Sequence, residues 1–167
     1  MYSVEINDAE VDAALARLEA HLDNMSGAFD DIGEYMVRST KERFTQGVSP
    51  EGVPWAPKSL PTIEAYRQRS DSRNSRLDYR PLFGPTGALS STISAQTGRD
   101  FAEIGSNMIY AGTMQFGASR GAFGSTSRGS PIPWGAIPAR PFLGVSDQDR
   151  VAIIDVIEEW LGGLVDD

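Results

Sequence analysis

The sequence predicts an α+β fold, in which two N-terminal helices and one C-terminal helix pack on a small antiparallel β-sheet of three or four strands. Apolar residues recur at helical spacing near both ends of the chain, and β-branched residues flank a tight turn in the middle. Prolines and glycines cluster between these parts and predict long irregular loops. At 167 residues, 40% of them hydrophobic, we expect a single domain, residues 1–167, with mobile loops at about 48–80 and 117–135.

Two amphipathic helices are expected at the N-terminal end. Asp8 is suited to cap the first, which spans about residues 8–24 and has apolar residues every three or four positions. The second runs from near Ser26 to Gly47, just before Pro50. One side of this second helix carries Phe29, Ile32, Met36 and Phe44. The two helices are expected to form an antiparallel pair.

Periodicity is lost between Val48 and Arg80, where four prolines and a polar stretch at Ser70–Arg76 predict irregular structure. One short helix is predicted there, at Thr62–Gln68. Trp55, between two of the prolines, is a large apolar side chain on this irregular segment. It is expected to hold the segment against the core or against a neighbouring molecule.

A β-hairpin is predicted in the middle of the chain. Its first strand is Thr92–Thr97, which is rich in β-branched residues, and its second is Phe101–Gly105. The turn between them is Gly98-Arg99-Asp100. A short helix is predicted next, at Ile109–Phe116.

The segment that follows is irregular and then extended. Residues 117–135 hold five glycines and four serines, and a loop of this length is either functional or disordered, so we expect it to become ordered against a partner. Ile137–Leu143 must be extended, because each of its prolines fixes its own φ and restricts the residue before it.

A C-terminal helix is predicted after this segment. Ser146 is suited to cap it, with Asp149 at the capping-box position, and Gly162-Gly163 is expected to end it. The stripe expected to be buried is Val151, Ile154, Ile157 and Leu161.

Charge is distributed unevenly along the chain. The net charge is −8, yet residues 1–40 carry nine acids against two bases and residues 141–167 carry seven acids against one base. The middle is basic, with eight bases against five acids in 41–80, and three arginines and no acid in 117–140. Such polarity suits self-association, in which an acidic face of one copy meets a basic face of the next.

Composition excludes several classes of site. The chain has no cysteine, so disulfides, zinc–thiolate sites and cysteine nucleophiles are excluded, as fits folding in a reducing cytoplasm. The first residues lack a basic leader, and no apolar run approaches the roughly 20 residues of a membrane span, so a soluble, non-secreted protein is expected.

Four segments, in this order, resemble the signatures of one family. They are Pro50–Trp55, Thr86–Leu89, Ile104–Gly117, which ends in Gln-Phe-Gly, and Ile137–Gly144. Together they are similar to the phage virion morphogenesis family, which includes the tail-completion proteins of P2-like phages and of phage Mu. The resemblance runs from about Phe29 to Leu161. One departure is Met114, where family members commonly carry histidine.

The resemblance implies a structural virion protein and not an enzyme, with no catalytic, metal or cofactor residues. It implies a tail-completion or terminator protein that finishes the tail so that it can join the head. Related proteins form rings, commonly sixfold, so a homohexamer is expected, in contact with the tail tube and with head connector and neck proteins. DNA would pass through its channel without specific binding. The protein would be in the host cytoplasm during assembly and then at the head–tail junction of the virion.

Nine residues, in the signature segments and in the glycine-rich segment 117–135, are candidates for the interface with other copies or partners. They are Trp55, Gln115, Phe116, Arg120, Phe123, Arg128, Trp134, Arg140 and Phe142. Phe142 is expected to anchor the extended segment, while Arg140 pairs with an acid or a carbonyl group.

Three alternatives stay open. The first is a neck or head-closure protein on the capsid side, which the sequence does not separate from tail completion. The second is a small hydrolase that uses Ser119 or the acids, because Gly117–Gly121 matches G-x-S-x-G. That motif needs a preceding strand and a later histidine, and the only histidine is His21. The third is a DNA-binding module, which the net charge disfavours.

Overall fold

The computed structural model describes residues 24–69 and 79–165, together with Ala13, Ala16, Glu19 and Leu22. The elements are α2 (Ser26–Gln46), α3 (Leu60–Arg69), α4 (Ala88–Ser91), β1 (Ile93–Thr97), β2 (Ala102–Ser106), α5 (Ala111–Phe116) and α6 (Asp147–Val165). The expected first helix, residues 8–24, lies largely outside the described residues, and so does the polar stretch 70–76. None of the helices in the described part of the chain is long and apolar enough to cross a lipid bilayer.

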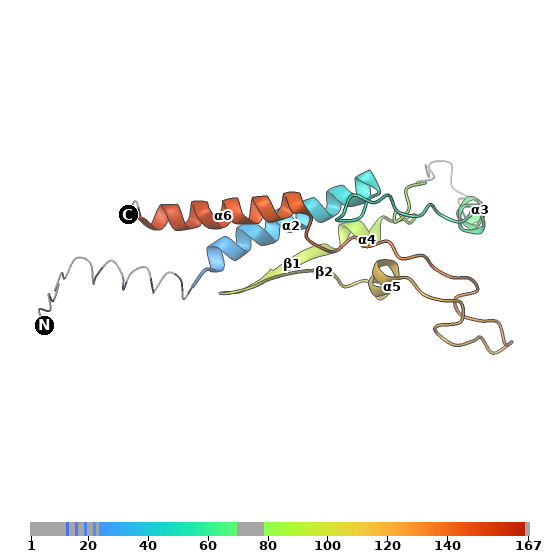
Figure 1. Ribbon diagram of the computed structural model, residues 1–167. Helices are drawn as coiled ribbons and strands as arrows, with labels where there is room; N and C mark the ends of the chain where they lie inside the picture. Colours follow the sequence, from blue (N-terminus) through green and yellow to red (C-terminus); the bar gives the residue numbers. More distant parts are fainter. Residues whose placement is uncertain are drawn as a thin grey trace, which may run out of the picture.

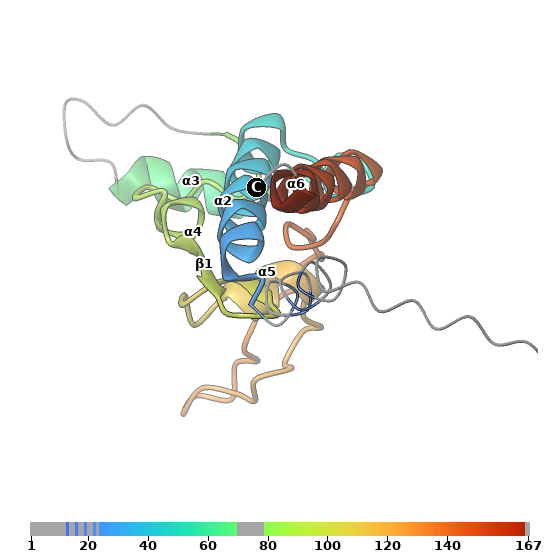
Figure 2. The same cartoon turned by 90° about the vertical axis from the view of Figure 1, so that its left-hand side faces the viewer.

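The α+β class predicted from the sequence is confirmed. Strands β1 and β2 form the predicted hairpin, with Ile93 opposite Ser106 and Thr97 opposite Ala102. Within the described ranges the sheet has two strands, where three or four were expected. Helices α2 and α6 lie side by side above the hairpin (Figure 1, Figure 2), and both strands contact α2.

Helix α2 is the central element, and its glycines explain where it ends and how closely it packs. It ends at Gly47, as predicted, with φ +75°, and the N–H of Gly47 donates to the carbonyl oxygen of Arg43 at 2.7 Å. At Gly33 a Cβ atom would lie 2.8 Å from Thr97 Cγ2, so glycine is what allows α2 to approach β1 this closely.

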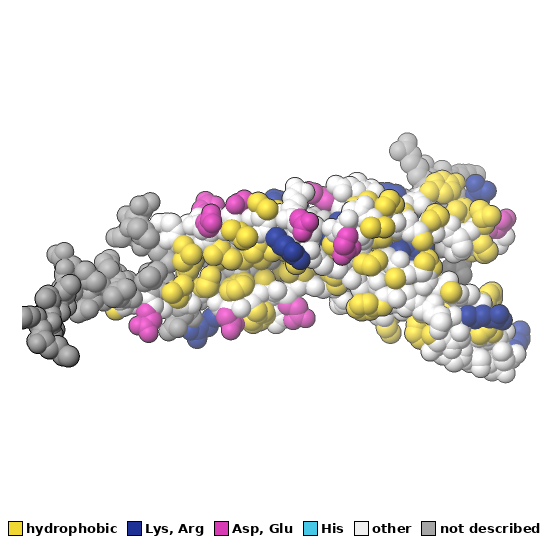
Figure 3. Space-filling model, in the orientation of Figure 1, with side chains coloured by type: hydrophobic (Ala, Val, Ile, Leu, Met, Phe, Trp, Pro, Cys, Tyr) yellow, Lys and Arg dark blue, Asp and Glu magenta, His cyan; other side chains and the backbone are white. Residues whose placement is uncertain are grey.

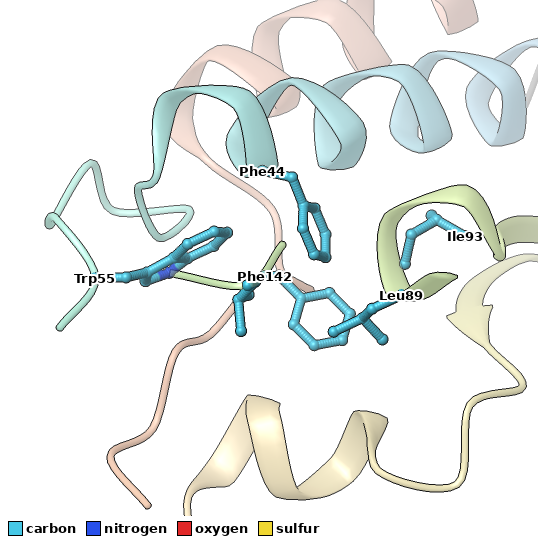
Figure 4. Close-up of a cluster of buried hydrophobic side chains, with 6 residues drawn as sticks. Phe44, Trp55, Leu89, Ile93 and Phe142 are labelled. Carbon is cyan, nitrogen blue, oxygen red and sulfur yellow. The ribbon is translucent and has the colours of Figure 1, made fainter. Parts of the chain in front are cut away.

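The core lies where α2, α4, β1 and the irregular segments meet. It consists of Phe44, Trp55, Leu82, Leu89, Ile93 and Phe142. Figure 4 shows Phe44 reaching from α2 to the middle of this cluster. Its ring centroid is 5.3 Å from that of Phe142 and 5.6 Å from that of Trp55, the latter in an edge-to-face arrangement. An aromatic cluster thus ties two irregular segments to the helix.

Helix α6 differs from the prediction in two ways. Val151 and Ile154, expected to be buried, are 59% and 53% exposed, whereas Asp149 is 1% exposed. The side of α6 that carries Asp149 faces α2, because Asp149 binds Arg43 of that helix. The side that carries Val151 and Ile154 therefore faces outward. The helix also continues past Gly162-Gly163 to Val165, because a glycine costs only about 1 kcal/mol in a helix and does not by itself end one.

Residues 117–137 form an arm that projects from the body (Figure 1). Its two legs are hydrogen-bonded at the base, from the N–H of Ala118 to the carbonyl oxygen of Ile137 at 2.9 Å and from the N–H of Ile137 to that of Ala118 at 2.7 Å. Further out, the N–H of Phe123 donates to the carbonyl oxygen of Ile132 at 2.8 Å. The glycine-rich segment is therefore an irregular two-legged arm, closed by its own backbone bonds.

Candidate functional site

In the part of the chain that the structure describes, the extended segment 137–144 pairs with no strand beyond a single bridge between Ile137 and Ala118, and side chains hold it in place. Arg140 is buried and donates from Nε to the carbonyl oxygen of Ala56 at 2.8 Å and from a terminal nitrogen to that of Pro57 at 3.0 Å. Burial lowers the pKa of Arg140. In return, Trp55 Nε1 donates to the carbonyl oxygen of Pro141 at 2.8 Å. Two of the four signature segments are thus bonded to each other.

Gln115 holds the same segment from the other side. Its Oε1 accepts the N–H groups of Phe142 at 2.9 Å and Leu143 at 3.0 Å, and its Nε2 donates to the carbonyl oxygen of Leu143 at 2.9 Å. The side-chain amide thereby replaces the backbone of a neighbouring strand. Phe142, between these bonds, is fully buried.

A buried ion pair fixes the end of the extended segment to both long helices. Arg43 of α2 binds Asp149 of α6, and their side chains are 6% and 2% exposed. Arg43 also donates to the carbonyl oxygens of Phe142 at 3.1 Å and Gly144 at 2.8 Å. One guanidinium therefore satisfies a carboxylate and two carbonyl groups where water is excluded.

Asp149 is satisfied from three further directions. Ser39 Oγ donates to its Oδ1 at 2.6 Å, and the N–H and Oγ of Ser146 each donate to its Oδ2 at 2.7 Å. Burial alone would raise the pKa of Asp149, but the hydrogen bonds from Ser39 and Ser146 and the charge of Arg43 outweigh it, so this pKa lies below its ordinary value. The predicted capping box is confirmed, since the N–H of Asp149 also donates to Ser146 Oγ at 3.1 Å.

The side chains that surround residues 137–144 form their hydrogen bonds with other groups of the same chain. Thr40 Oγ1 is the buried side-chain atom without a partner in the described part of the protein. Among the described residues, no three His, Cys, Asp or Glu side chains lie close enough to hold a metal ion. Ser119 of the G-x-S-x-G match is exposed in the arm, with neither a strand before it nor a helix after it. The arrangement holds a backbone in a fixed shape.

The nine candidate interface residues fall into two groups. Four have side chains that bind or pack within the chain: Trp55, Gln115, Arg140 and Phe142. Five are exposed, in the arm or next to it: Phe116, Arg120, Phe123, Arg128 and Trp134. These five exposed residues remain the candidates for contact with another molecule.

Sequence reasoning missed Arg43 and the outward face of α6. The sequence did contain a signal for Arg43. It stands next to Phe44, at the end of the apolar side of the helix, and a buried charge there would be costly without a partner of opposite charge. The outward face of α6 had a signal too, since apolar residues occur on more than one side of that helix.

Comparison with known proteins bears on the whole chain. The model of the phage virion morphogenesis family matches residues 6–162. The chain is also 28% identical, over 166 residues, to the Mu-like prophage FluMu G protein 2 of Haemophilus influenzae, and the match covers 99% of each protein. No solved structure matches the chain significantly.

Proposed function

Since this chain belongs to the phage virion morphogenesis family and has a structural role in phage assembly, we propose that it completes the tail. In this proposal it forms a ring, a homohexamer, at the head-proximal end of the tail, where it contacts the tail tube and the connector and neck proteins of the head. DNA passes through the ring without specific binding, and the protein makes and breaks no covalent bond.

The observation that carries the proposal is how the chain uses its signature residues. Trp55, Gln115 and Arg140 come from three signature segments, and all three bind backbone groups within the chain. Because these side chains are bonded to the backbone, they stabilise the shape of the chain and are not available to bind a substrate. This supports a role in which shape and contact are the function.

The exposed arm supports the assembly part of the proposal. Phe123 and Trp134 in the arm are 58% and 78% exposed, and Phe116 at the end of α5 beside it is 81% exposed. Large aromatic side chains exposed to water commonly mark a protein–protein contact. A ring needs a heterologous contact, in which one face of each copy meets a different face of the next. An arm that projects from one end of the body is suited to reach a neighbouring copy.

Particles made without this protein test the proposal. The expected result is DNA-filled heads beside full-length tails that do not join, with joining restored by the wild-type chain. Heads that lose their DNA while tails remain normal would favour the alternative, a neck or head-closure protein on the capsid side. Normal numbers of infectious particles would refute both.

A further inference from the structure

Helix α6 presents an outward apolar face that is bounded by acidic residues. Val151 and Ile154 lie on it, each more than half exposed. Asp155 and Glu158 each follow one of these residues by four positions, and Asp147 and Arg150 each precede one of them by four, so this side of the helix carries three acids and one base. Figure 3 shows hydrophobic side chains gathered over the end of the molecule where α6 and the hairpin lie, with acidic side chains above and below them and Lys or Arg side chains also at the border. We call Val151, Ile154, Asp155 and Glu158 the α6 face.

The arm has the opposite chemistry. Residues 117–137 contain Arg120 and Arg128 and no acid, and the arm exposes the aromatic side chains of Phe123 and Trp134. The arm therefore combines exposed aromatic side chains with positive charge. The α6 face combines exposed aliphatic side chains with negative charge. The two surfaces are complementary in both respects.

The arm and the α6 face lie toward opposite ends of the molecule (Figure 1). Helix α6 extends toward one end of the molecule and the arm projects toward the other. A contact between the arm of one copy and the α6 face of another would therefore join the two copies head to tail. A head-to-tail contact closes into a ring when its rotation is a whole fraction of a turn, and it otherwise extends into a filament.

We propose that the arm of one copy docks on the α6 face of the next, with Phe123 and Trp134 against Val151 and Ile154, and with the arm arginines beside the α6 acids. This rests on the ring of the proposed function and names the surfaces that form it.

Charge argues against other occupants of the α6 face. A second α6 would bring acids against acids and would close a twofold dimer, which cannot extend to a ring. Residues 1–23 of the same chain, which precede α2, carry six acids against one base, so this segment would also meet like charge. Nucleic acid would be repelled by Asp155 and Glu158.

Site-directed cross-linking tests the contact, because the chain has no cysteine to interfere. A variant with Trp134→Cys and Ile154→Cys is treated with a short bismaleimide, both as purified protein and in assembled particles. The expected result is a ladder of covalent oligomers that ends at the ring size. The matched control pairs Ile154→Cys with Leu60→Cys, a position on α3 that is 78% exposed and outside the arm, and should give no ladder.

Charge exchange supplies a second test. Arg128→Glu and Glu158→Arg should each weaken association by about two- to five-fold per contact, as expected for loss of an exposed ion pair. The variant that carries both changes should recover the association of the wild type. Equal weakening in the single variants without recovery in the double variant would overturn the proposed pairing of these surfaces.

The outcomes separate this contact from the proposed function. A ring seen by light scattering or in particles, with no ladder from the Trp134–Ile154 pair, overturns the arm contact and leaves the ring in place. A dimer cross-linked by Ile154→Cys alone overturns it in favour of an α6–α6 pair. A link formed inside one chain overturns it as well. A protein that stays monomeric and never enters particles overturns the proposed function itself.

Discussion

Removing either partner of the Arg43–Asp149 pair should destabilise the fold far more than removing both. The two side chains are 6% and 2% exposed, so Arg43→Met leaves the Asp149 carboxylate in a dry site without its counter-charge. Breaking a buried pair in this way costs about 3–5 kcal/mol. Asp149→Leu leaves the Arg43 charge buried and should cost a similar amount, about 3–5 kcal/mol.

The double variant Arg43→Met with Asp149→Leu buries no charge at all. What it still loses is the Asp149 half of the capping box, in which the N–H and Oγ of Ser146 donate to the carboxylate, at about 1 kcal/mol. The carbonyl groups of Phe142 and Gly144 also lose a donor, at about 1 kcal/mol each. The double variant should therefore lose about 3 kcal/mol, against about 6–10 kcal/mol for the sum of the single changes, which is a coupling of about 3–7 kcal/mol.

Urea denaturation followed by far-ultraviolet circular dichroism measures these free energies of unfolding. Arg150→Met is the matched control, because its pairing with Asp147, at 3.7 Å, is between exposed side chains and should contribute less than about 1 kcal/mol. Single costs that simply add in the double variant would refute the argument that the pair is a buried, mutually dependent unit.

Four further changes have expected outcomes. Phe142→Ala should lower the free energy of unfolding by about 3–5 kcal/mol, since this ring is fully buried in the core. Gln115→Ala removes its bonds to Phe142 and Leu143 and should cost about 2–3 kcal/mol, with faster proteolysis of the extended segment. The lowered pKa of Asp149 means that its charge stabilises the fold above its ordinary pKa of 3.8 and that this stability is lost as pH falls through the folded value, so Asp149→Asn should flatten the acid limb of a stability–pH curve. Ser119→Ala should leave the yield of infectious particles unchanged.

Each of these can fail in a recognisable way. Unchanged stability in Phe142→Ala or Gln115→Ala would contradict the role given to the segment around them. An acid limb as steep in Asp149→Asn as in the wild type would mean that another group titrates there. Loss of particles with Ser119→Ala, when the protein remains folded, would revive the hydrolase hypothesis.

Local signals in the sequence predicted the elements well. The apolar spacing before Gly47 located α2 and its end, and the turn at Gly98-Arg99-Asp100 located the hairpin to within one residue at each strand. The capping box of Ser146 and Asp149 was likewise visible, because it depends on residues three positions apart. These features are set by neighbours in the chain, which a sequence displays directly.

Contacts between distant residues were not predictable in the same way. The orientation of α6 depends on Asp149 meeting Arg43, which is 106 positions earlier, and periodicity within α6 alone favoured the opposite side. The role of Gln115 depends on backbone groups 27 and 28 positions later that no strand serves. The composition of residues 117–135 predicted irregular structure, yet the closure of residues 117–137 into an arm depends on backbone bonds between its two legs.

A density map of the intact virion at the head–tail junction tests the central claim most directly. It should show copies of this chain as a closed ring on the head-proximal end of the tail, with the arm of each copy in contact with its neighbour. A junction formed without this polypeptide, or copies that touch no other copy, would contradict the account.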